Sequence, residues 1–307
     1  MSALFSSTGH GAPTAGAGRS DSAKEFEFTT RDFERVRTMI YRRAGIALAD
    51  SKQEMVYSRL ARRLRATGLA SFAAYLDTLE RNPDSGEWES FTNALTTNLT
   101  AFFREAHHFP LLAEHVAGRK EPVTIWCSAS STGEEPYSIA MTLCEAFGSL
   151  NPPARVIATD IDTNVLATGE RGVYSVDRIE RMEPERVKRF FLKGKGAQAG
   201  MVRVRDELRA MVTFKQLNLL SEHWPISGPF DAIFCRNVMI YFDKPTQGRI
   251  LARFAPLMKP DGLLFAGHSE NFLYVSDLFR LRGKTVYELA DKGAASGIGH
   301  AATARKA

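Results

Sequence analysis

The second half of this 307-residue chain alternates short apolar runs with longer helical stretches, and no other feature constrains its fold as strongly. The strand-like runs are Val123–Cys127, Arg155–Thr159, Phe230–Cys235 and Gly262–Ala266. The helical stretches that separate them are 134–147, 163–169 and 244–258. Alternating strands and helices predict an α/β domain with a parallel sheet covered on both faces. Ligands of such sheets bind beyond the carboxyl ends of the strands, so we expect the chemistry there.

Two segments interrupt this alternation. Between residues 186 and 217, short runs predict a small antiparallel β-subdomain inserted in the larger domain. These runs are Lys193–Gly196, Met201–Val204 and Met211–Phe214. Near the C-terminal end, Phe279–Arg282 and Thr285–Leu289 form a hairpin pattern around a Gly-Lys pair. A closing antiparallel hairpin on a parallel sheet is typical of methyltransferase folds rather than of dehydrogenases.

The segment before the sheet has a helical pattern instead. From Thr29 to about Asn98 the apolar residues recur at helical spacing, which predicts an all-α domain of four or five helices over residues 25–98. The breakers between the helices are Gly45, Gly68 and Asn82–Asp84. The helix starts that capping residues indicate are Thr30, Asp50 and Ser71. Residues 99–120 then link this domain to the α/β domain, which is expected to span 121–290.

Composition excludes several other classes of protein. Residues 1–24 and 291–307 consist mainly of small residues, so both are expected to be disordered tails. No run approaches the roughly eighteen apolar residues of a membrane span, and no signal-peptide pattern is present, so a cytoplasmic protein without membrane insertion is expected. The cysteines, Cys127, Cys144 and Cys235, are widely spaced without a CxxC pair, so they indicate reduced core thiols and no metal site. The net charge of +5 favours an acidic partner.

The turn after the first strand, Ser128–Ser138, opens a helix and contains small residues that let a ligand approach the backbone. It lacks both the G-x-G-x-x-G of a dinucleotide site and the Gly-Lys-Ser/Thr of a P-loop. An ordinary capping turn is the alternative that the spacing alone favours. In that alternative Ser131 or Thr132 caps the helix, and Glu134 and Glu135 complement its dipole.

Charged residues follow two further strands. Asp160, at the end of the second strand, is placed to accept hydrogen bonds from a ribose diol. The alternative role, a helix N-cap, fits Asp162 better than Asp160. Arg236 directly follows a buried strand, which is costly unless an anion meets its charge. A ligand contact and a salt bridge to a neighbouring acid are equally good explanations of Arg236.

Taken together, five strings of residues resemble the CheR-type chemotaxis receptor methyltransferases, over nearly the whole chain from Phe26 to Ala290. The strings are Thr97–Glu105, Ser131–Ser138, Ala158–Asp162, Cys235–Phe242 and Gly267–Glu270. Any one of them alone is unspecific, but five in this order are not. The resemblance implies a helical N-terminal domain that recognises substrate and a linker that contributes to the cofactor pocket. After these it implies a Rossmann-like class I methyltransferase domain with the inserted β-subdomain.

The same resemblance implies the activity. The cofactor would be S-adenosylmethionine, with S-adenosylhomocysteine as product. The acceptors would be glutamate side chains of chemotaxis receptors, and the methyl esters formed on them would adjust receptor signalling. The residues implied to contact the cofactor are Asn98, Thr100, Arg104, Glu135, Asp160, Asn218, Leu219, Arg236 and Asn237. Arg104 and Tyr241 would lie nearest the reacting methyl group. In the inserted subdomain, the residues implied to dock a receptor C-terminal pentapeptide are Lys193, Gly194, Gly196 and Arg203.

A basic stripe in the helical domain is consistent with an acidic protein substrate. On a helical wheel for residues 52–66 one face is apolar, and the opposite face is basic. The basic residues are Lys52, Arg59, Arg62, Arg63 and Arg65. A solvated helix face is the ordinary explanation, but an acidic receptor coiled coil would be steered by such a stripe. Nucleic acid is not expected because no aromatic platform lies on that face.

Two rival functions remain open at this stage. One is a cofactor-binding signalling module without transfer activity, against which an intact Arg104 and Tyr241 argue. The other is a methyltransferase that acts on small molecules or nucleic acid. A monomer is expected in every case.

Overall fold

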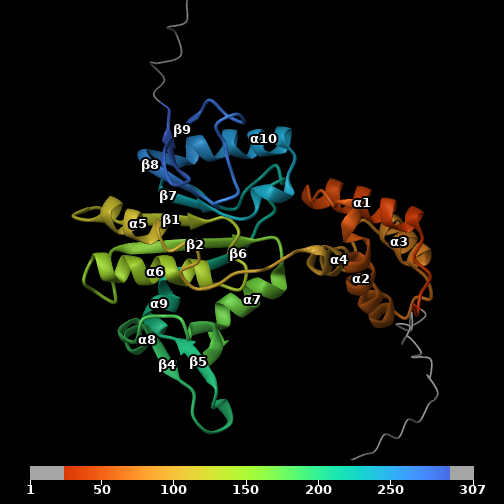
Figure 1. Ribbon diagram of the computed structural model, residues 1–307, viewed down its shortest axis with the longest axis horizontal. Helices are drawn as coiled ribbons and strands as arrows, with labels where there is room; N and C mark the ends of the chain where they lie inside the picture. The colour runs from red at the N-terminus through yellow and green to blue at the C-terminus, as the bar shows by residue number, and fades with distance from the viewer. Residues whose placement is uncertain (1–23, 291–307) are drawn as a thin grey trace, which may run out of the picture.

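The computed structural model describes residues 24–290 and shows two domains joined by an extended segment (Figure 1). The tails predicted at 1–24 and 291–307 lie outside the described residues, except for Lys24. Within the described part of the chain, no helix combines the length and the apolar character that a membrane crossing requires.

The N-terminal domain is a bundle of four α-helices, as the spacing predicted. They are α1 (Thr30–Ala44), α2 (Gln53–Thr67), α3 (Phe72–Arg81) and α4 (Glu87–Leu95), with a 3-10 turn at Asp50–Lys52. Local signals explain the ends of these helices. Thr29 and Asp32 form a capping box at the start of α1, Ser71 caps α3, and left-handed glycines at positions 45 and 68 end α1 and α2. The apolar faces meet in one core around Leu60 and Phe72.

The second domain is built on a seven-stranded sheet in the order β6-β2-β1-β7-β8-β10-β9. Its strands are β1 (Val123–Cys127), β2 (Ala154–Asp160), β6 (Val212–Gln216), β7 (Phe230–Cys235), β8 (Met258–Ala266), β9 (Phe279–Gly283) and β10 (Val286–Leu289). Strands β6, β2, β1, β7 and β8 run parallel, whereas β10 lies antiparallel between β8 and β9. The predicted parallel sheet and its closing antiparallel hairpin are therefore confirmed.

Helices cover both faces of this sheet. They are α5 (His108–Val116), α6 (Glu134–Ala146), α7 (Thr163–Arg171), α9 (Asp206–Met211) and α10 (Lys244–Phe254). Along β7, Ala232 and Phe234 point into a core with α5 and α6, while Ile233 and Cys235 point into a core with α10. Because both faces of the strands are buried, their sequences are continuous apolar runs.

A second, three-stranded antiparallel sheet projects from the domain near α6 and α9 (Figure 1). It consists of β3 (Val173–Ser175), β4 (Phe191–Lys193) and β5 (Met201–Val204), with α8 (Pro184–Phe190) preceding β4. The inserted β-subdomain expected at 186–217 is thus present, but the assignment of Met211–Phe214 to it is wrong. Met211 is the last residue of α9, and Val212–Phe214 begin β6, which pairs in parallel with β2 and buries Val212 in the main core.

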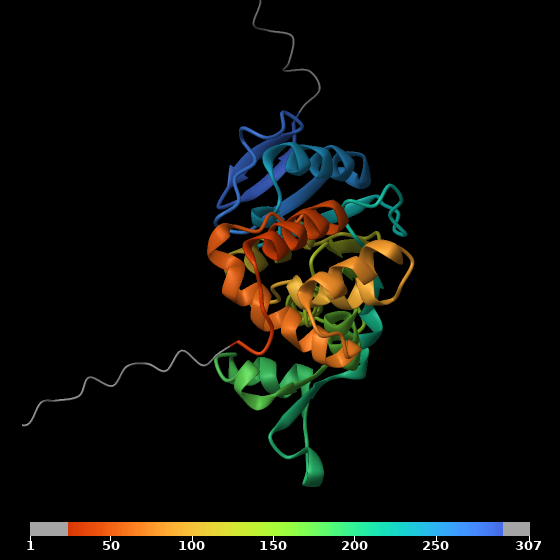
Figure 2. The ribbon, with the colours of Figure 1, turned by 90° about the vertical axis from the view of Figure 1, so that its right-hand side faces the viewer.

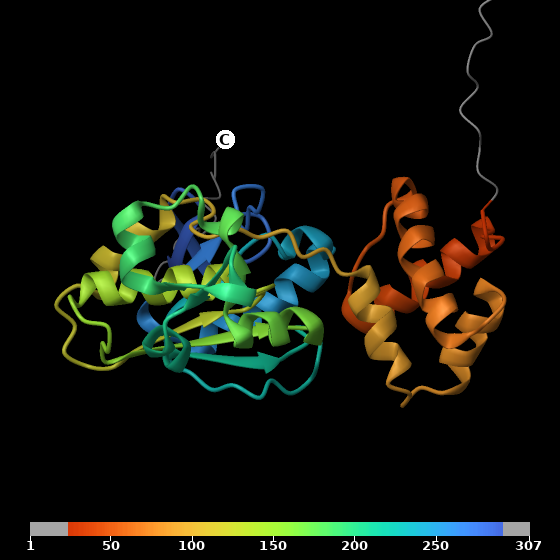
Figure 3. The same ribbon diagram turned by 90° about the horizontal axis from the view of Figure 1, so that it is seen from below.

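The helical domain packs against the carboxyl ends of the parallel strands (Figures 2 and 3). The Ala47 N–H donates to the carbonyl of Tyr241 at 3.0 Å, and the Asn218 side chain donates to the carbonyl of Arg43 at 2.7 Å. Gly45 lies in this junction with φ 71°, where a Cβ atom would come within 2.8 Å of Leu220. The junction therefore requires glycine both for its backbone conformation and for the close approach.

Candidate active site

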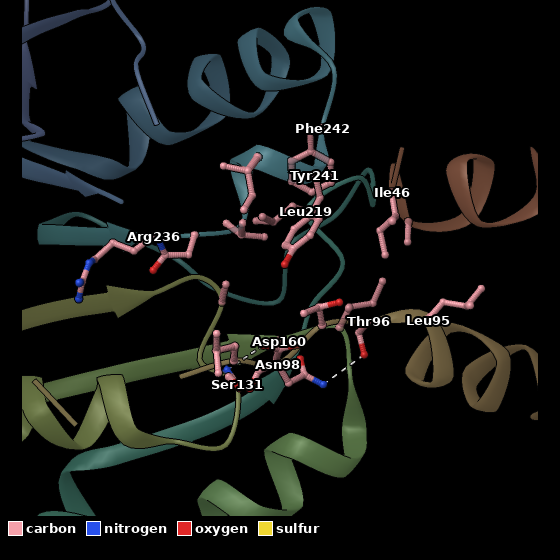
Figure 4. Close-up of a pocket in the computed structure, with 18 of the residues that line it drawn as sticks. Ile46, Leu95, Thr96, Asn98, Ser131, Asp160, Leu219, Arg236, Tyr241 and Phe242 are labelled. Atoms are coloured by element: carbon pink, nitrogen blue, oxygen red, sulfur yellow. Dashed lines mark hydrogen bonds between the residues drawn. The ribbon is translucent and has the colours of Figure 1, made fainter. Parts of the chain in front are cut away.

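A cavity of about 360 Å³ lies at the carboxyl ends of β1, β2 and β7, where the helical domain faces the sheet (Figure 4). This volume is within the range of small-molecule sites, roughly 300–1,000 Å³. The residues implied for cofactor binding or catalysis all line it: Asn98, Thr100, Arg104, Glu135, Asp160, Asn218, Leu219, Arg236, Asn237 and Tyr241. The fold thus brings together side chains from the linker, three strand ends and two loops.

The cavity has apolar walls from both domains. Ile46 and Leu95 enter it from the helical domain, and Leu219 and Phe242 enter it from loops of the sheet domain (Figure 4). Sequence reasoning did not assign the helical-domain side chains to the pocket, because nothing in their local pattern separates a cavity wall from a core. Apolar walls with a few convergent polar groups suit a flat nucleoside base.

Asp160 lies at the floor of the cavity, and its carboxylate accepts the backbone N–H groups of Ser131 at 2.9 Å and Asp162 at 3.0 Å. Burial raises the pKa of Asp160 to about 6, against the opposing effect of these donors. A carboxylate has about four acceptor positions, so it retains capacity for hydroxyl donors. Asp162 caps α7 by accepting the Asn164 N–H at 3.0 Å, as expected.

The turn between β1 and α6 does not cap α6 through Ser131 or Thr132, as the alternative interpretation of this turn expected. The N-cap of α6 is Gly133, in the left-handed region, and no side chain caps the helix. Ser131 is also left-handed, with φ 47°, which directs its N–H to Asp160. Glu134 is paired with Arg178. The turn therefore orients the Asp160 carboxylate rather than capping α6 through a hydroxyl.

Arg236 occupies a buried cluster of charges at the other end of the cavity. Its guanidinium lies 2.7 Å from Glu135 and 3.4 Å from Glu105, and it donates to the Arg104 carbonyl at 2.5 Å. The salt bridge considered for Arg236 is therefore present, although Arg236 also lines the cavity. Glu135, which lines the cavity, is a carboxylate that can meet the ammonium group of a ligand.

The two carboxylates of this cluster differ in their electrostatics. Burial by itself would raise the pKa of Glu105, but the hydrogen bond from His268 and the charge of Arg236 lower this pKa to about 2. Burial raises the pKa of Glu135, although the charge of Arg236 opposes that effect. Sequence reasoning assigned no role to Glu105, and its position beside Arg104 in a resembling string was the signal available.

Glu105 also belongs to the one group of side chains within residues 24–290 that has the spacing of metal ligands, together with His107 and His108. The charge of Arg236 at 3.4 Å from Glu105 opposes a cation there. Burial and the same Arg236 charge lower the pKa of His108 to about 4. We therefore interpret the group as part of the ion-pair cluster.

The linker around Arg104 has an unusual backbone. Phe103 and Glu105, on either side of it, have φ values of 51° and 52°, which is rare for residues other than glycine. The Phe103 N–H donates to the Ser138 hydroxyl at 2.9 Å, and the Phe103 ring packs edge-on against Phe109. These contacts hold the strained segment that places Arg104 at the cavity.

Tyr241 ends a 3-10 turn, Met239–Tyr241, that follows β7. Its ring is half-buried, and its hydroxyl points into the cavity (Figure 4). The side chains of Asn98 and Asn218 are engaged in holding the walls. Asn98 donates to Asp162 at 2.8 Å, and Asn218 accepts the Leu220 N–H at 2.9 Å.

The residues predicted to bind substrate are more dispersed. Lys52 lines the cavity and Arg62 is exposed, but the other arginines of α2 have partners within the domain. Arg59 donates to the Thr96 carbonyl at 2.5 Å, Arg63 pairs with Glu87 at 2.7 Å, and Arg65 pairs with Glu25 at 2.7 Å. The residues of the small sheet do not line the cavity: Lys193, Gly194, Gly196 and Arg203.

The sheet order with an inverted β10, the acid at the end of β2 and the cavity above β1 define a class I S-adenosylmethionine-dependent methyltransferase. Residues 98–288 match the family model described as the CheR methyltransferase, SAM binding domain, and residues 31–96 match the CheR methyltransferase, all-alpha domain. The chain belongs to the CheR methyltransferase family, and its cofactor is S-adenosylmethionine.

Several curated relatives are similar along most of their length. The chemotaxis protein methyltransferase of Klebsiella aerogenes is 55% identical over 92% of this chain and 97% of its own. Chemotaxis protein methyltransferase 2 of Pseudomonas aeruginosa is 57% identical over 87% of this chain and 96% of its own. The chemotaxis protein methyltransferase of Escherichia coli is 57% identical over 84% of this chain and 90% of its own.

Proposed function

We propose that this chain is a cytoplasmic, monomeric protein-glutamate O-methyltransferase that esterifies glutamate side chains of chemotaxis receptors and so adjusts their signalling. The observation that carries this proposal is the placement of Arg104 and Tyr241 on the same cavity as Asp160 and the Arg236 cluster. The names of the relatives, chemotaxis protein methyltransferases, support a protein of the chemotaxis system as the substrate.

The chemistry requires positioning rather than a strong base. A glutamate carboxylate, with an ordinary pKa of about 4.3, is already an ionised nucleophile at neutral pH. Bound S-adenosylmethionine supplies a methyl group activated by its sulfonium. Arg104 positions the incoming carboxylate, and Tyr241 orients it through its hydroxyl. A tight ion pair with Arg104 would stabilise the ground state, so its contribution is placement rather than strong binding.

The domains divide the work. The helical domain, residues 25–98, recognises the receptor helix, with Lys52 at the cavity and Arg62 on the exposed surface as the basic contacts. The linker, residues 99–120, supplies Arg104, and residues 121–290 hold the cofactor. Arg63 and Arg65 form ion pairs within the domain, so they are weaker candidates for substrate contact than Lys52 and Arg62.

The small sheet offers a separate docking position for a receptor tail. Within the described chain β4 pairs only with β5, so its other side is a strand edge. Leu192 and Lys193 on β4 are exposed. An extended peptide could add to such an edge by main-chain hydrogen bonds, with Lys193 meeting an acidic side chain or its terminal carboxylate. Arg203, on β5, pairs with Asp206 at 3.1 Å and is therefore the weaker candidate of the two basic residues.

Methyl transfer is tested with tritiated S-adenosylmethionine and receptor-containing membranes. The expected result is base-labile label in the receptor, as for a glutamate methyl ester. Cofactor binding by isothermal titration without label transfer would support the rival signalling module. Label in RNA would support a nucleic-acid methyltransferase.

Peptide docking is tested by titrating a pentapeptide from a receptor C-terminus into the protein. Lys193→Ala is expected to weaken binding at least fivefold. Lys188→Ala is the matched control, because Lys188 is an exposed lysine on the neighbouring α8. Equal affinity of wild type and both variants would contradict the assignment.

A further inference from the structure

The backbone after β7 forms a concave site for an anion. Asn237 is left-handed, with φ 58°, so the N–H groups of residues 237, 238 and 239 converge on one point. The Glu270 carboxylate occupies this point. It accepts the N–H groups of Asn237 at 2.9 Å, Val238 at 2.9 Å and Met239 at 2.7 Å, and also that of Gly267 at 2.6 Å.

Glu270 is only 4% exposed, and other residues pack closely around its carboxylate. A Cβ atom at position 267 would come within 2.5 Å of the Asn237 side chain and 2.8 Å of the Glu270 carboxylate. Burial raises the pKa of Glu270, while its four backbone donors oppose that effect. Without this carboxylate, buried N–H groups would lose their acceptor, which is costly in a protein interior.

The anion site leads directly into the turn that carries Tyr241. The Tyr241 N–H donates to the Val238 carbonyl at 3.1 Å, so the turn starts from a residue that Glu270 holds. From the other side, the Gln247 side chain donates to the carbonyls of Met239 at 2.8 Å and Phe242 at 3.0 Å. The turn is thus held through its N–H groups by Glu270 and through its carbonyls by Gln247.

We propose that Glu270 is a positioning residue for methyl transfer, which fixes the Tyr241 hydroxyl in the cavity by filling the anion site of residues 237–239. The inference rests on the proposed role of Tyr241. Glu270 itself contributes no atom to the cavity wall.

A double-mutant cycle with Glu270→Gln and Tyr241→Phe tests this role. Glu270→Gln keeps the shape of the side chain but replaces one of the two carboxylate oxygens that accept the four N–H groups with an NH2 donor. We expect kcat to fall at least tenfold. If Glu270 acts through Tyr241, the double variant loses much less activity than the product of the two single losses. A kcat of Glu270→Gln within twofold of wild type, or losses that multiply, would overturn the proposal.

Asp231→Asn is the matched control for a general effect of a buried carboxylate. Asp231 is 0% exposed at the opposite end of β7, where it accepts the Thr124 N–H and pairs with Arg119 and Lys259. The effect of Asp231→Asn on kcat is expected to multiply with that of Tyr241→Phe.

If Glu270→Gln does not fold, Glu270→Asp takes its place in the same cycle, because the shorter side chain keeps the charge but moves the carboxylate away from the N–H groups. A wild-type kcat of Tyr241→Phe would instead refute the role of Tyr241.

Discussion

Lowering the pH is expected to weaken cofactor binding through Asp160. Its carboxylate has a pKa of about 6, and only the ionised form accepts both hydroxyls of a ribose. At pH 5, one unit below this pKa, about one tenth of the free protein has Asp160 ionised. The affinity for S-adenosylhomocysteine at pH 5 should therefore be about tenfold lower than at pH 7.5, a difference of about 1.4 kcal/mol.

The stability of the cofactor-free protein should change in the opposite direction. The pKa of Asp160 is raised in the folded state from the ordinary value of 3.8. The folded protein thus binds the proton more tightly than the unfolded chain does. This contribution to stability is fully present below about pH 3.8 and is lost as the pH rises through about 6. The increase in melting temperature caused by S-adenosylhomocysteine should accordingly be larger at pH 7.5 than at pH 5.

Isothermal titration with S-adenosylhomocysteine between pH 5 and 7.5 measures the effect. Asp160→Asn is the control, because an amide cannot titrate in this range, so its weaker binding should not depend on pH. A wild-type affinity that is constant across the range would refute the role assigned to Asp160. An equal pH dependence in Asp160→Asn would show that a group other than Asp160 titrates in this range.

Two further substitutions probe the domain junction and the linker. Gly45→Ala places a Cβ atom within 2.8 Å of Leu220 at a φ of 71°. This substitution should destabilise the protein by about 1–3 kcal/mol and weaken cofactor binding. Thermal melts with and without S-adenosylhomocysteine measure both effects. Arg104→Ala should lower kcat at least tenfold, because Arg104 positions the acceptor, and should change the affinity for the cofactor by a smaller factor than kcat. A wild-type methylation rate with unchanged substrate affinity would contradict this prediction.

The sequence by itself determined the sheet and the position of Asp160 at the end of one of its strands. The buried strands β1 and β7 were predicted with their observed bounds, because strands covered on both faces need continuous apolar residues and this pattern is local. Asp160 could be placed beside the cavity because parallel strands bring their carboxyl ends to one edge, so position along the chain predicts position in the fold.

Only the tertiary structure decided which partners the charged residues find. Arg236 meets Glu135, 101 residues earlier in the chain, and Arg65 meets Glu25, 40 residues earlier. The pattern at Met211–Phe214 is the same for a small sheet as for an edge of the large one, and pairing with β2 settled it. Glu270 showed no local signal of its role, since the anion site it fills is formed by the backbone of another loop. Such pairings depend on distances through space, which local sequence patterns do not encode.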